Sequence, residues 1–157
     1  MAVPYALNAE KATIASNVSG LETINEGNGI GHRIIGRNPD YYGAIGNRAM
    51  DLSYSSSNSN SHGATGNFSF AAGNGSESSG LASLAIGNSC VSSLDKSTAI
   101  GNETRAEGLF STAIGSNSEA SDSFAVAIGN VAKATGESAT ALGKLTTASG
   151  KSATAFG

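Results

Sequence analysis

The sequence predicts an all-β solenoid made of stacked 14-residue coils. The first observation is a glycine that recurs at a constant interval in the C-terminal half, each time with alanine two places before it. These glycines are Gly73, Gly87, Gly101, Gly115, Gly129, Gly143 and Gly157. A fixed short period indicates that each repeat is one structural unit stacked on the next. Such a chain lines up a repeated surface and is unlikely to build the single convergent pocket of an enzyme.

The second observation is a weaker glycine column halfway between the first. It consists of Gly66, Gly80, Gly108, Gly136 and Gly150, with Leu94 and Asp122 in the same place in two repeats. Ser, Thr, Gly and Asn fill these segments and are poor helix formers, so each coil is expected to hold two short strands and two turns. We expect the glycines to supply the positive φ that each reversal needs.

The third observation is a two-residue alternation before each main glycine, which is typical of a strand. One set of alternate positions is uniformly small, as in Ser97 and Ala99, and a thin coil has room only for these in its interior. The other set then points outward, and its main column is Ile86, Ile100, Ile114, Ile128, Leu142 and Phe156. The opposite arrangement, with this column inside and alanine at a subunit contact, stays open.

The outward column predicts an oligomer. Left in water, these six side chains would forgo on the order of 10 to 15 kcal/mol, at roughly 1.5 to 3 kcal/mol each. They would also form a continuous apolar ribbon of the kind that marks an interface. The simplest partner is an identical chain around a symmetry axis, and either arrangement of the column leads to an oligomer.

Composition limits the other possibilities. The chain has 21 glycines, 39% hydrophobic and 13% charged residues, and a flexible linker would have no reason to hold its isoleucines in register. A formal charge of -3 without a Lys/Arg cluster argues against nucleic acid or an anionic membrane as a partner. No apolar run approaches the roughly 20 residues of a membrane span, so direct membrane insertion is not expected, and no charged and apolar leader follows Met1.

The N-terminal part is less regular. We expect residues 1–28 to form a cap, either extended or as a short helix after Asn8, and residues 29–157 to form the solenoid. Within it, residues 29–66 are irregular coils and 60–157 carry the regular repeats. Gly73 follows Gly46 one place too early for two full repeats. A loop or a deletion must absorb this slip, and the Ser- and Asn-rich stretch 54–61 is its expected site, at the surface.

Residues that carry chemistry are sparse. His32 and His62 have no carboxylate or cysteine at a metal-ligand spacing, and the glycines around Gly29 fit a turn better than a phosphate loop. The sequence has no G-x-S-x-G elbow. We therefore expect no metal, no cofactor and no catalysis. Cys90 is the only cysteine, and it is either a tolerated small residue near the wall of the coil or the site of a disulfide that links the oligomer.

One cluster has the residue types that favour protein interfaces. Arg33, Arg37, Tyr41 and Tyr42 lie close together in the sequence and are the candidate ligand contacts. The alternative is that they form a cap over the open end of the solenoid.

The repeats resemble a known family. The phrases STAIGNETRAEGLFSTAIGSNSEASDSFAVAIGN and SATALGKLTTASGKSATAFG look like the head domain of trimeric autotransporter adhesins of Gram-negative bacteria. The resemblance covers about residues 43–157 and implies a left-handed parallel β-roll that forms a homotrimer. It also implies display at the cell surface, on a coiled-coil stalk anchored in the outer membrane by a β-barrel. The family binds host extracellular matrix proteins, host cells or immunoglobulins.

The sequence shows no neck, heptad stalk or membrane anchor, so we expect it to be a piece of a longer protein. Three functions follow. The leading one is an adhesive module that gains affinity by multivalency. A structural spacer with no ligand of its own is the second. The third is a polysaccharide-directed fibre of phage or toxin type, which requires a groove with two facing carboxylates. Glu77, Glu103 and Glu119 do not fall in one column, so the sequence does not supply that groove.

Overall fold

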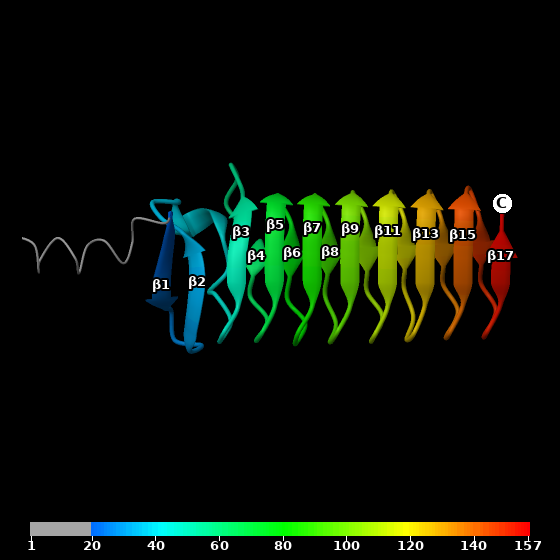
Figure 1. Cartoon of the computed structure of the whole chain (residues 1–157), viewed down its shortest axis with the longest axis horizontal. Coiled ribbons are helices and arrows are strands. Elements are labelled where there is room, and N and C mark those ends of the chain that lie inside the picture. Colours follow the sequence, from blue (N-terminus) through cyan, green and yellow to red (C-terminus); the bar gives the residue numbers. More distant parts are fainter. Residues whose placement is uncertain (1–19) are drawn as a thin grey trace, which may run out of the picture.

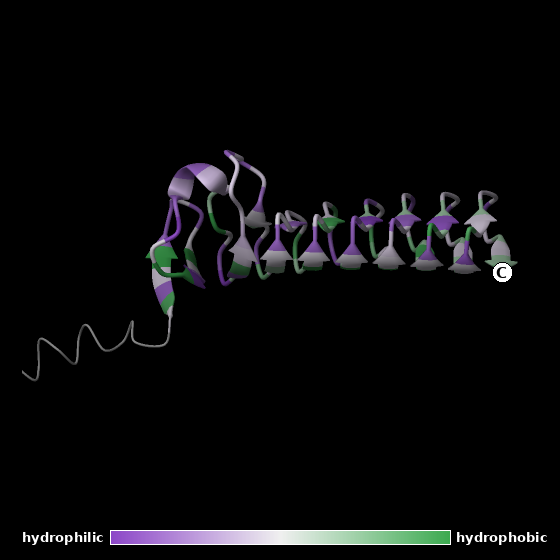
Figure 2. Ribbon diagram, turned by 90° about the horizontal axis from the view of Figure 1, so that it is seen from above, coloured by the Kyte–Doolittle hydropathy of each residue, from purple (hydrophilic) through white to green (hydrophobic). Residues whose placement is uncertain are grey.

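The computed structural model describes residues 20–157 as a rod of stacked β-coils. The helix or extended segment expected after Asn8 lies outside the described residues for most of its length. Figure 1 shows the long strands side by side along the rod, with short strands behind them from β3 onward. Figure 2, turned by 90°, shows that the coils form two layers with little space between them.

The long strands form one sheet. In the described residues it has ten strands in the order β1-β2-β3-β5-β7-β9-β11-β13-β15-β17. Their bounds are β1 (Leu21–Asn25), β2 (Ile30–Ile34), β3 (Met50–Tyr54), β5 (Phe70–Asn74), β7 (Leu84–Asn88), β9 (Thr98–Asn102), β11 (Thr112–Ser116), β13 (Val126–Asn130), β15 (Thr140–Lys144) and β17 (Thr154–Phe156). Apart from the antiparallel β1–β2 hairpin, neighbours are parallel. Each residue of β11 pairs with the equivalent residue of the next coil in β13, as Ile114 does with Ile128.

The short strands form the second sheet. Over residues 20–157 it has seven parallel strands in the order β16-β14-β12-β10-β8-β6-β4. They are β4 (Gly63–Ala64), β6 (Glu77–Ser78), β8 (Val91–Ser92), β10 (Arg105–Ala106), β12 (Glu119–Ala120), β14 (Lys133–Ala134) and β16 (Thr147–Ala148). A 3-10 turn, η1 (Pro39–Tyr41), follows the hairpin. The all-β solenoid with 14-residue coils is therefore confirmed.

From β5 onward the interior contains only small side chains, as the alternation predicted. The inward alanines of β5 to β15 and the alanines of the later short strands are buried. Buried serines bond across the space between the sheets: Ser78 Oγ lies 2.7 Å from Ser83 Oγ, and Ser92 Oγ lies 2.8 Å from Ser97 Oγ. Because the sheets lie this close, these four buried hydroxyls bond to one another in pairs.

The two glycine columns have different physical causes, and the prediction of a positive φ in both is only half right. Gly101 has φ +135°, and a Cβ there would overlap the carbonyl oxygen of Gly115 in the next coil. Gly108 is not at positive φ, yet a Cβ would overlap the backbone of Asp122. In that turn the positive φ falls two residues later, on Phe110 at 57°. Close stacking of backbones, more than a positive φ, therefore favours glycine in the second column, although Leu94 and Asp122 occupy it in two coils.

The register of the first coils differs from the expected one. Asn47 N donates to Asn67 Oδ1, which lies 20 residues away, whereas the equivalent bond from Leu81 N to Asp95 Oδ1 spans 14 residues. An insertion of six residues, and not a deletion of one, therefore separates these coils. It lies in the segment 55–62 between β3 and β4, where the loop was expected.

The insertion also changes the column to which the phrase Ala44-Ile45-Gly46 belongs. A Cβ on Gly46 would overlap the carbonyl of Gly66, so Gly46 stacks in the second glycine column and not in that of Gly73. Ile45 consequently points inward and is only 1% exposed, unlike the outward isoleucines of the later repeats. The expected boundary between residues 28 and 29 falls in the turn of the β1–β2 hairpin.

Candidate interaction surfaces

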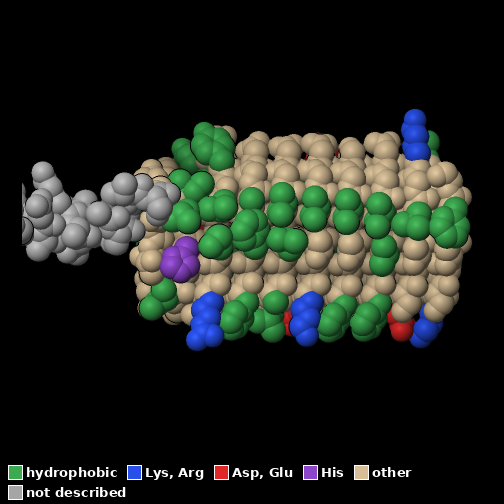
Figure 3. Space-filling model, viewed as in Figure 1, with side chains coloured by type: hydrophobic (Ala, Val, Ile, Leu, Met, Phe, Trp, Pro, Cys, Tyr) green, Lys and Arg blue, Asp and Glu red, His purple; other side chains and the backbone are tan. Residues whose placement is uncertain are grey.

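The outer face of the ten-stranded sheet carries a continuous apolar ribbon. The column predicted to point outward lies on it: Ile86, Ile100, Ile114 and Leu142 are half-buried, whereas Ile128 and Phe156 are 38% and 75% exposed. Figure 3 shows this column as a row of hydrophobic side chains across the strands. The ribbon widens where a second outward column carries apolar residues, at Phe70, Leu84 and Val126.

A polar column lies beside the ribbon, towards the end of each strand. Asn74 Nδ2 donates to Asn88 Oδ1 at 3.1 Å, and Asn88 Nδ2 donates to Asn102 Oδ1 at 2.9 Å. This ladder of side-chain amides uses hydrogen-bonding groups that would otherwise bind water. Because this polar column borders the ribbon on one side, the apolar surface extends on the opposite side, towards the turn that precedes each long strand.

That turn carries aromatic and basic side chains in register. Phe110 and Phe124 are stacked with ring centroids 5.1 Å apart, and Lys96 Nζ lies 4.8 Å from the centre of the Phe110 ring. In an earlier coil the Arg48 guanidinium lies 5.6 Å from the Phe68 ring. Figure 3 shows basic and apolar side chains interspersed along one edge of the molecule. The side chains all leave residues at φ 56–60°, which places them one above another.

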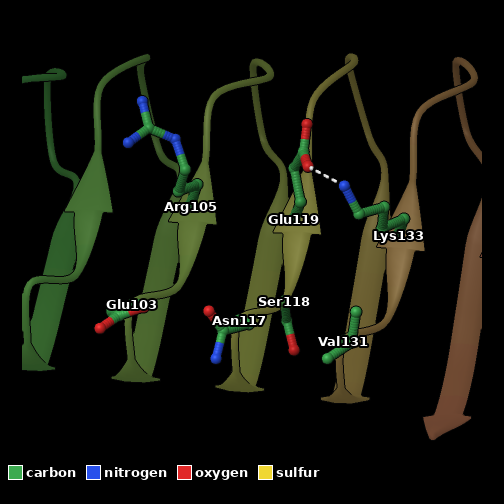
Figure 4. Close-up of a pocket in the computed structure, with 7 residues that line it drawn as sticks. All are labelled: Glu103, Arg105, Asn117, Ser118, Glu119, Val131 and Lys133. Atoms are coloured by element: carbon green, nitrogen blue, oxygen red, sulfur yellow. Dashed lines mark hydrogen bonds and ion pairs between the residues drawn. The ribbon is translucent and has the colours of Figure 1, made fainter. Parts of the chain in front are cut away.

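The seven-stranded sheet presents a charged face with a shallow groove of about 330 Å³. Figure 4 shows the side chains that line it: Glu103, Arg105, Asn117, Ser118, Glu119, Val131 and Lys133. Lys133 Nζ lies 3.0 Å from Glu119 Oε2, and Arg105 pairs with Glu107. Hydrogen bonds from Lys133 and Ser121 hold the pKa of Glu119 below its ordinary value. Because these charges pair with one another along the sheet, the groove has little net charge to offer a ligand.

The four candidate ligand contacts do not form one site. Arg33 Nε donates to Glu22 Oε1 at 2.7 Å, and its Nη1 pairs with Glu26. Although burial opposes it, these two carboxylates raise the pKa of Arg33. Glu26 also accepts from Ile45 N at 2.8 Å, so the cluster ties the hairpin to the next coil.

Arg37, Tyr41 and Tyr42 do lie together, in a pocket of about 310 Å³ at the N-terminal end of the roll. Arg37 Nη1 lies 2.5 Å from Asp51 Oδ2, and the Tyr42 ring lies 3.8 Å from the guanidinium carbon. Sequence reasoning missed Asp51. This residue lies opposite Ala71 in the register between β3 and β5, at an inward position where later coils have alanine. The signal was a charged residue in a column of small, buried side chains. The insertion concealed this signal, because it shifts the position of Asp51 relative to the later repeats.

The remaining candidates for chemistry have structural contacts. His32 Nδ1 lies 3.2 Å from Thr23 Oγ1, and His62 Nδ1 lies 2.9 Å from Ser55 Oγ. Within residues 20–157, no three His, Cys, Asp or Glu side chains gather as they would around a metal ion. Cys90 is free and fully buried, and its sulfur contacts the carbonyl of Gly101 at 3.1 Å. Its place inside the roll removes it from the reach of another chain, so the linking disulfide is wrong.

Among the described residues, no helix has the length and apolar character needed to cross a membrane.

Fold and surfaces define a class: a rod of stacked β-coils with apolar, polar and charged columns repeated along its faces, of the kind that bacterial surface adhesins use as heads. A family model described as the YadA head domain repeat matches residues 64–90, 78–104, 95–118, 106–132 and 134–157. These segments cover more than half of the chain, which belongs to the YadA head family and is a head of the trimeric autotransporter adhesin type. No curated protein and no solved structure matched the chain.

Proposed function

We propose that this chain is the head of a bacterial surface adhesin that attaches to host extracellular matrix proteins, host cells or immunoglobulins as a homotrimer. Membership of the YadA head family supports the adhesin, and the continuous apolar ribbon supports the oligomer. In this proposal the coils are left-handed. A stalk and a membrane anchor outside this sequence hold the head at the cell surface.

The ribbon of Ile86, Ile100, Ile114, Ile128, Leu142 and Phe156 is the proposed contact between the three chains. These side chains are already half-buried within one chain for the most part. Association therefore recovers only a part of the free energy that their complete burial would provide. Identical ribbons around a threefold axis can bury one another, because each chain places the same apolar residue at the same level along the axis.

Threefold symmetry also supports the adhesive function. The described surfaces are shallow and repeated, so each contact with a ligand is expected to be weak. Three heads on one stalk raise the effective concentration of the second and third contacts, provided that the ligand is repetitive or immobilised. A matrix fibre or a cell surface meets that condition.

The oligomer is tested with Ile114→Asp and with Asn117→Asp as the matched control. Both add one negative charge to the same coil, but Ile114 lies in the ribbon and Asn117 on an exposed turn. Light scattering should report a trimer for the parent and for Asn117→Asp, and smaller species for Ile114→Asp, because a buried unpaired carboxylate is costly. A monomeric parent would contradict the proposed trimer.

Adhesion is tested with the trimer on surfaces coated with collagens, fibronectin, laminin or immunoglobulin, and on cells. We expect retention on at least one surface, and much weaker binding when the same ligand is offered as a short soluble fragment. Failure of a folded trimer to bind any of them would favour the spacer.

A further inference from the structure

The pocket at the N-terminal end of the roll contains a buried cation that is only half paired. Its walls are Ile34, Ile35, Tyr41, Tyr42 and Tyr54, with Arg37 beside them. The Arg37 side chain is 6% exposed, and Asp51, its partner, is 1% exposed. Within residues 20–157, Arg37 Nε and Nη2 are buried and have no hydrogen-bond partner.

Asp51 cannot serve the free edge of the guanidinium. Its Oδ2 accepts from Arg37 Nη1, and its Oδ1 accepts from Ser53 N at 2.9 Å and from Ser53 Oγ at 2.6 Å. Tyr42 covers one face of the guanidinium. The Nε and Nη2 atoms that remain form one edge of the guanidinium, and such an edge binds a carboxylate with two parallel hydrogen bonds.

Several other polar atoms of the pocket are already used within the chain. The Tyr42 hydroxyl donates to Ser53 O and accepts from Ser55 N at 2.8 Å. Asn38 Oδ1 accepts from Asp40 N at 3.1 Å. A sugar, which carries a hydroxyl on most of its carbons, would leave hydroxyls unpaired against the side chains of Ile34 and Ile35. A single carboxylate on an aliphatic stem matches them better.

We propose that this pocket binds the side-chain carboxylate of a glutamate or aspartate on a partner protein, with Arg37 as its hydrogen-bond donor. The proposal rests on the adhesive function proposed above and names the chemistry of one contact. An unpaired buried donor is costly, so a ligand that pairs with it gains affinity. Because the two nitrogens are buried, a lining side chain must turn aside, and Tyr54, 64% exposed, has the room to do so.

The test measures binding of a hexaglutamate peptide to the whole chain by NMR titration. Hexaglutamine is the neutral control, and glucuronic acid is the sugar that carries the same carboxylate. Hexaglutamate should bind at least tenfold more tightly than hexaglutamine and shift amide signals around Arg37, and added salt should weaken it. Equal binding of the two peptides, or preferential binding of glucuronic acid, would overturn the proposal.

Two exposed isoleucines of the same hairpin region provide the matched variants. Ile35→Glu places a negative charge in the pocket wall, whereas Ile30→Glu places it at an exposed position outside the lining. Ile35→Glu should weaken hexaglutamate binding at least tenfold and Ile30→Glu less than twofold. Arg37→Lys keeps a cation for Asp51 but removes the guanidinium edge, so it should also lose binding. Equal effects of the two isoleucine variants would contradict the site.

The test of the pocket and the test of the adhesive function can fail independently. Peptide binding needs no matrix protein, so hexaglutamate can bind while every coated surface fails, which would reject the adhesive function alone. If the trimer adheres but neither Ile35→Glu nor Arg37→Lys changes its binding of hexaglutamate, the pocket is wrong and adhesion stands.

Discussion

Phe110 and Phe124 occupy equivalent positions in neighbouring coils and stack with an angle of 7° between their rings. Both residues have a positive φ, 57° and 60°, which is unusual for large side chains. The turn requires this conformation whatever residue occupies it, since Ala82 and Ser138 adopt it as well. The repeat therefore aligns the two rings, and their contact offsets a part of the local strain.

A double-mutant cycle should measure this contact. We expect Phe110→Ala and Phe124→Ala to show a coupling free energy of about 0.5 to 1.5 kcal/mol, as is typical of aromatic pairs. Denaturant unfolding of the two single variants and the double variant gives the value. The pair Phe68 and Phe124 lies in separated coils and serves as the control, with no measurable coupling expected.

The interior should reject even a small increase in volume. Ala113→Val adds two methyl groups to a fully buried column, and we expect it to lower the free energy of unfolding by about 1 to 3 kcal/mol. Thr112→Val introduces the same residue one place earlier on the outer face of β11, and its effect should stay within about 0.5 kcal/mol. Thermal or denaturant unfolding distinguishes the two, and equal effects would refute the inward alanine column.

Alanine substitutions at two glycines should distinguish the effect of backbone stacking on stability from the effect of backbone conformation. Both Gly101 and Gly75 have positive φ, but a Cβ on Gly101 would overlap the next coil, whereas a Cβ on Gly75 meets only Ser89 Oγ at 3.8 Å. Gly75→Ala should cost about 1 kcal/mol, for the left-handed conformation alone. Gly101→Ala should cost several times more, or prevent folding. Comparable melting temperatures for the two variants would show that stacking does not demand glycine.

The ladder of charges on the seven-stranded sheet should respond to acid. The hydrogen bond from Lys133 lowers the pKa of Glu119 from 4.5, with a second contribution from Ser121. A lowered pKa in the folded chain means that this stability is present above the unfolded-state pKa and is lost as the pH falls through the folded-state value. Since both side chains are about a third to a half exposed, the effect should stay below about 1 kcal/mol.

An NMR titration of the Glu119 carboxyl checks this shift directly. The midpoint should lie below 4.5 in the parent. In Lys133→Ala it should move upward, because the first donor and its charge are gone. Lys144→Ala removes a cation from another face and should leave the midpoint unchanged. An unchanged midpoint in Lys133→Ala would mean that the ion pair does not form in solution.

The N-terminal coils mark the limit of what a single sequence reveals. The sequence pattern did not link Arg37 to Asp51, because Asp51 stands in no column of the regular repeats. Its pairing with Ala71 depends on the backbone ladder between β3 and β5, which follows a six-residue insertion. Local composition located this loop near residues 54–61. The length of the insertion follows only from the hydrogen bonds that pair the coils on its two sides.

The sequence by itself determined the solenoid, the 14-residue coil, the small interior and the outward isoleucine column from Ile86 onward. It could do so because each coil contacts only its neighbours, so one repeated local pattern specifies the whole stack. Only the tertiary structure decided that Ile45 points inward and that Arg37 pairs with Asp51 inside the roll. It also decided that close stacking of backbones, and not a positive φ, favours glycine in the second column. These features depend on which backbone atoms meet across coils of unequal length, and no local residue pattern contains that information.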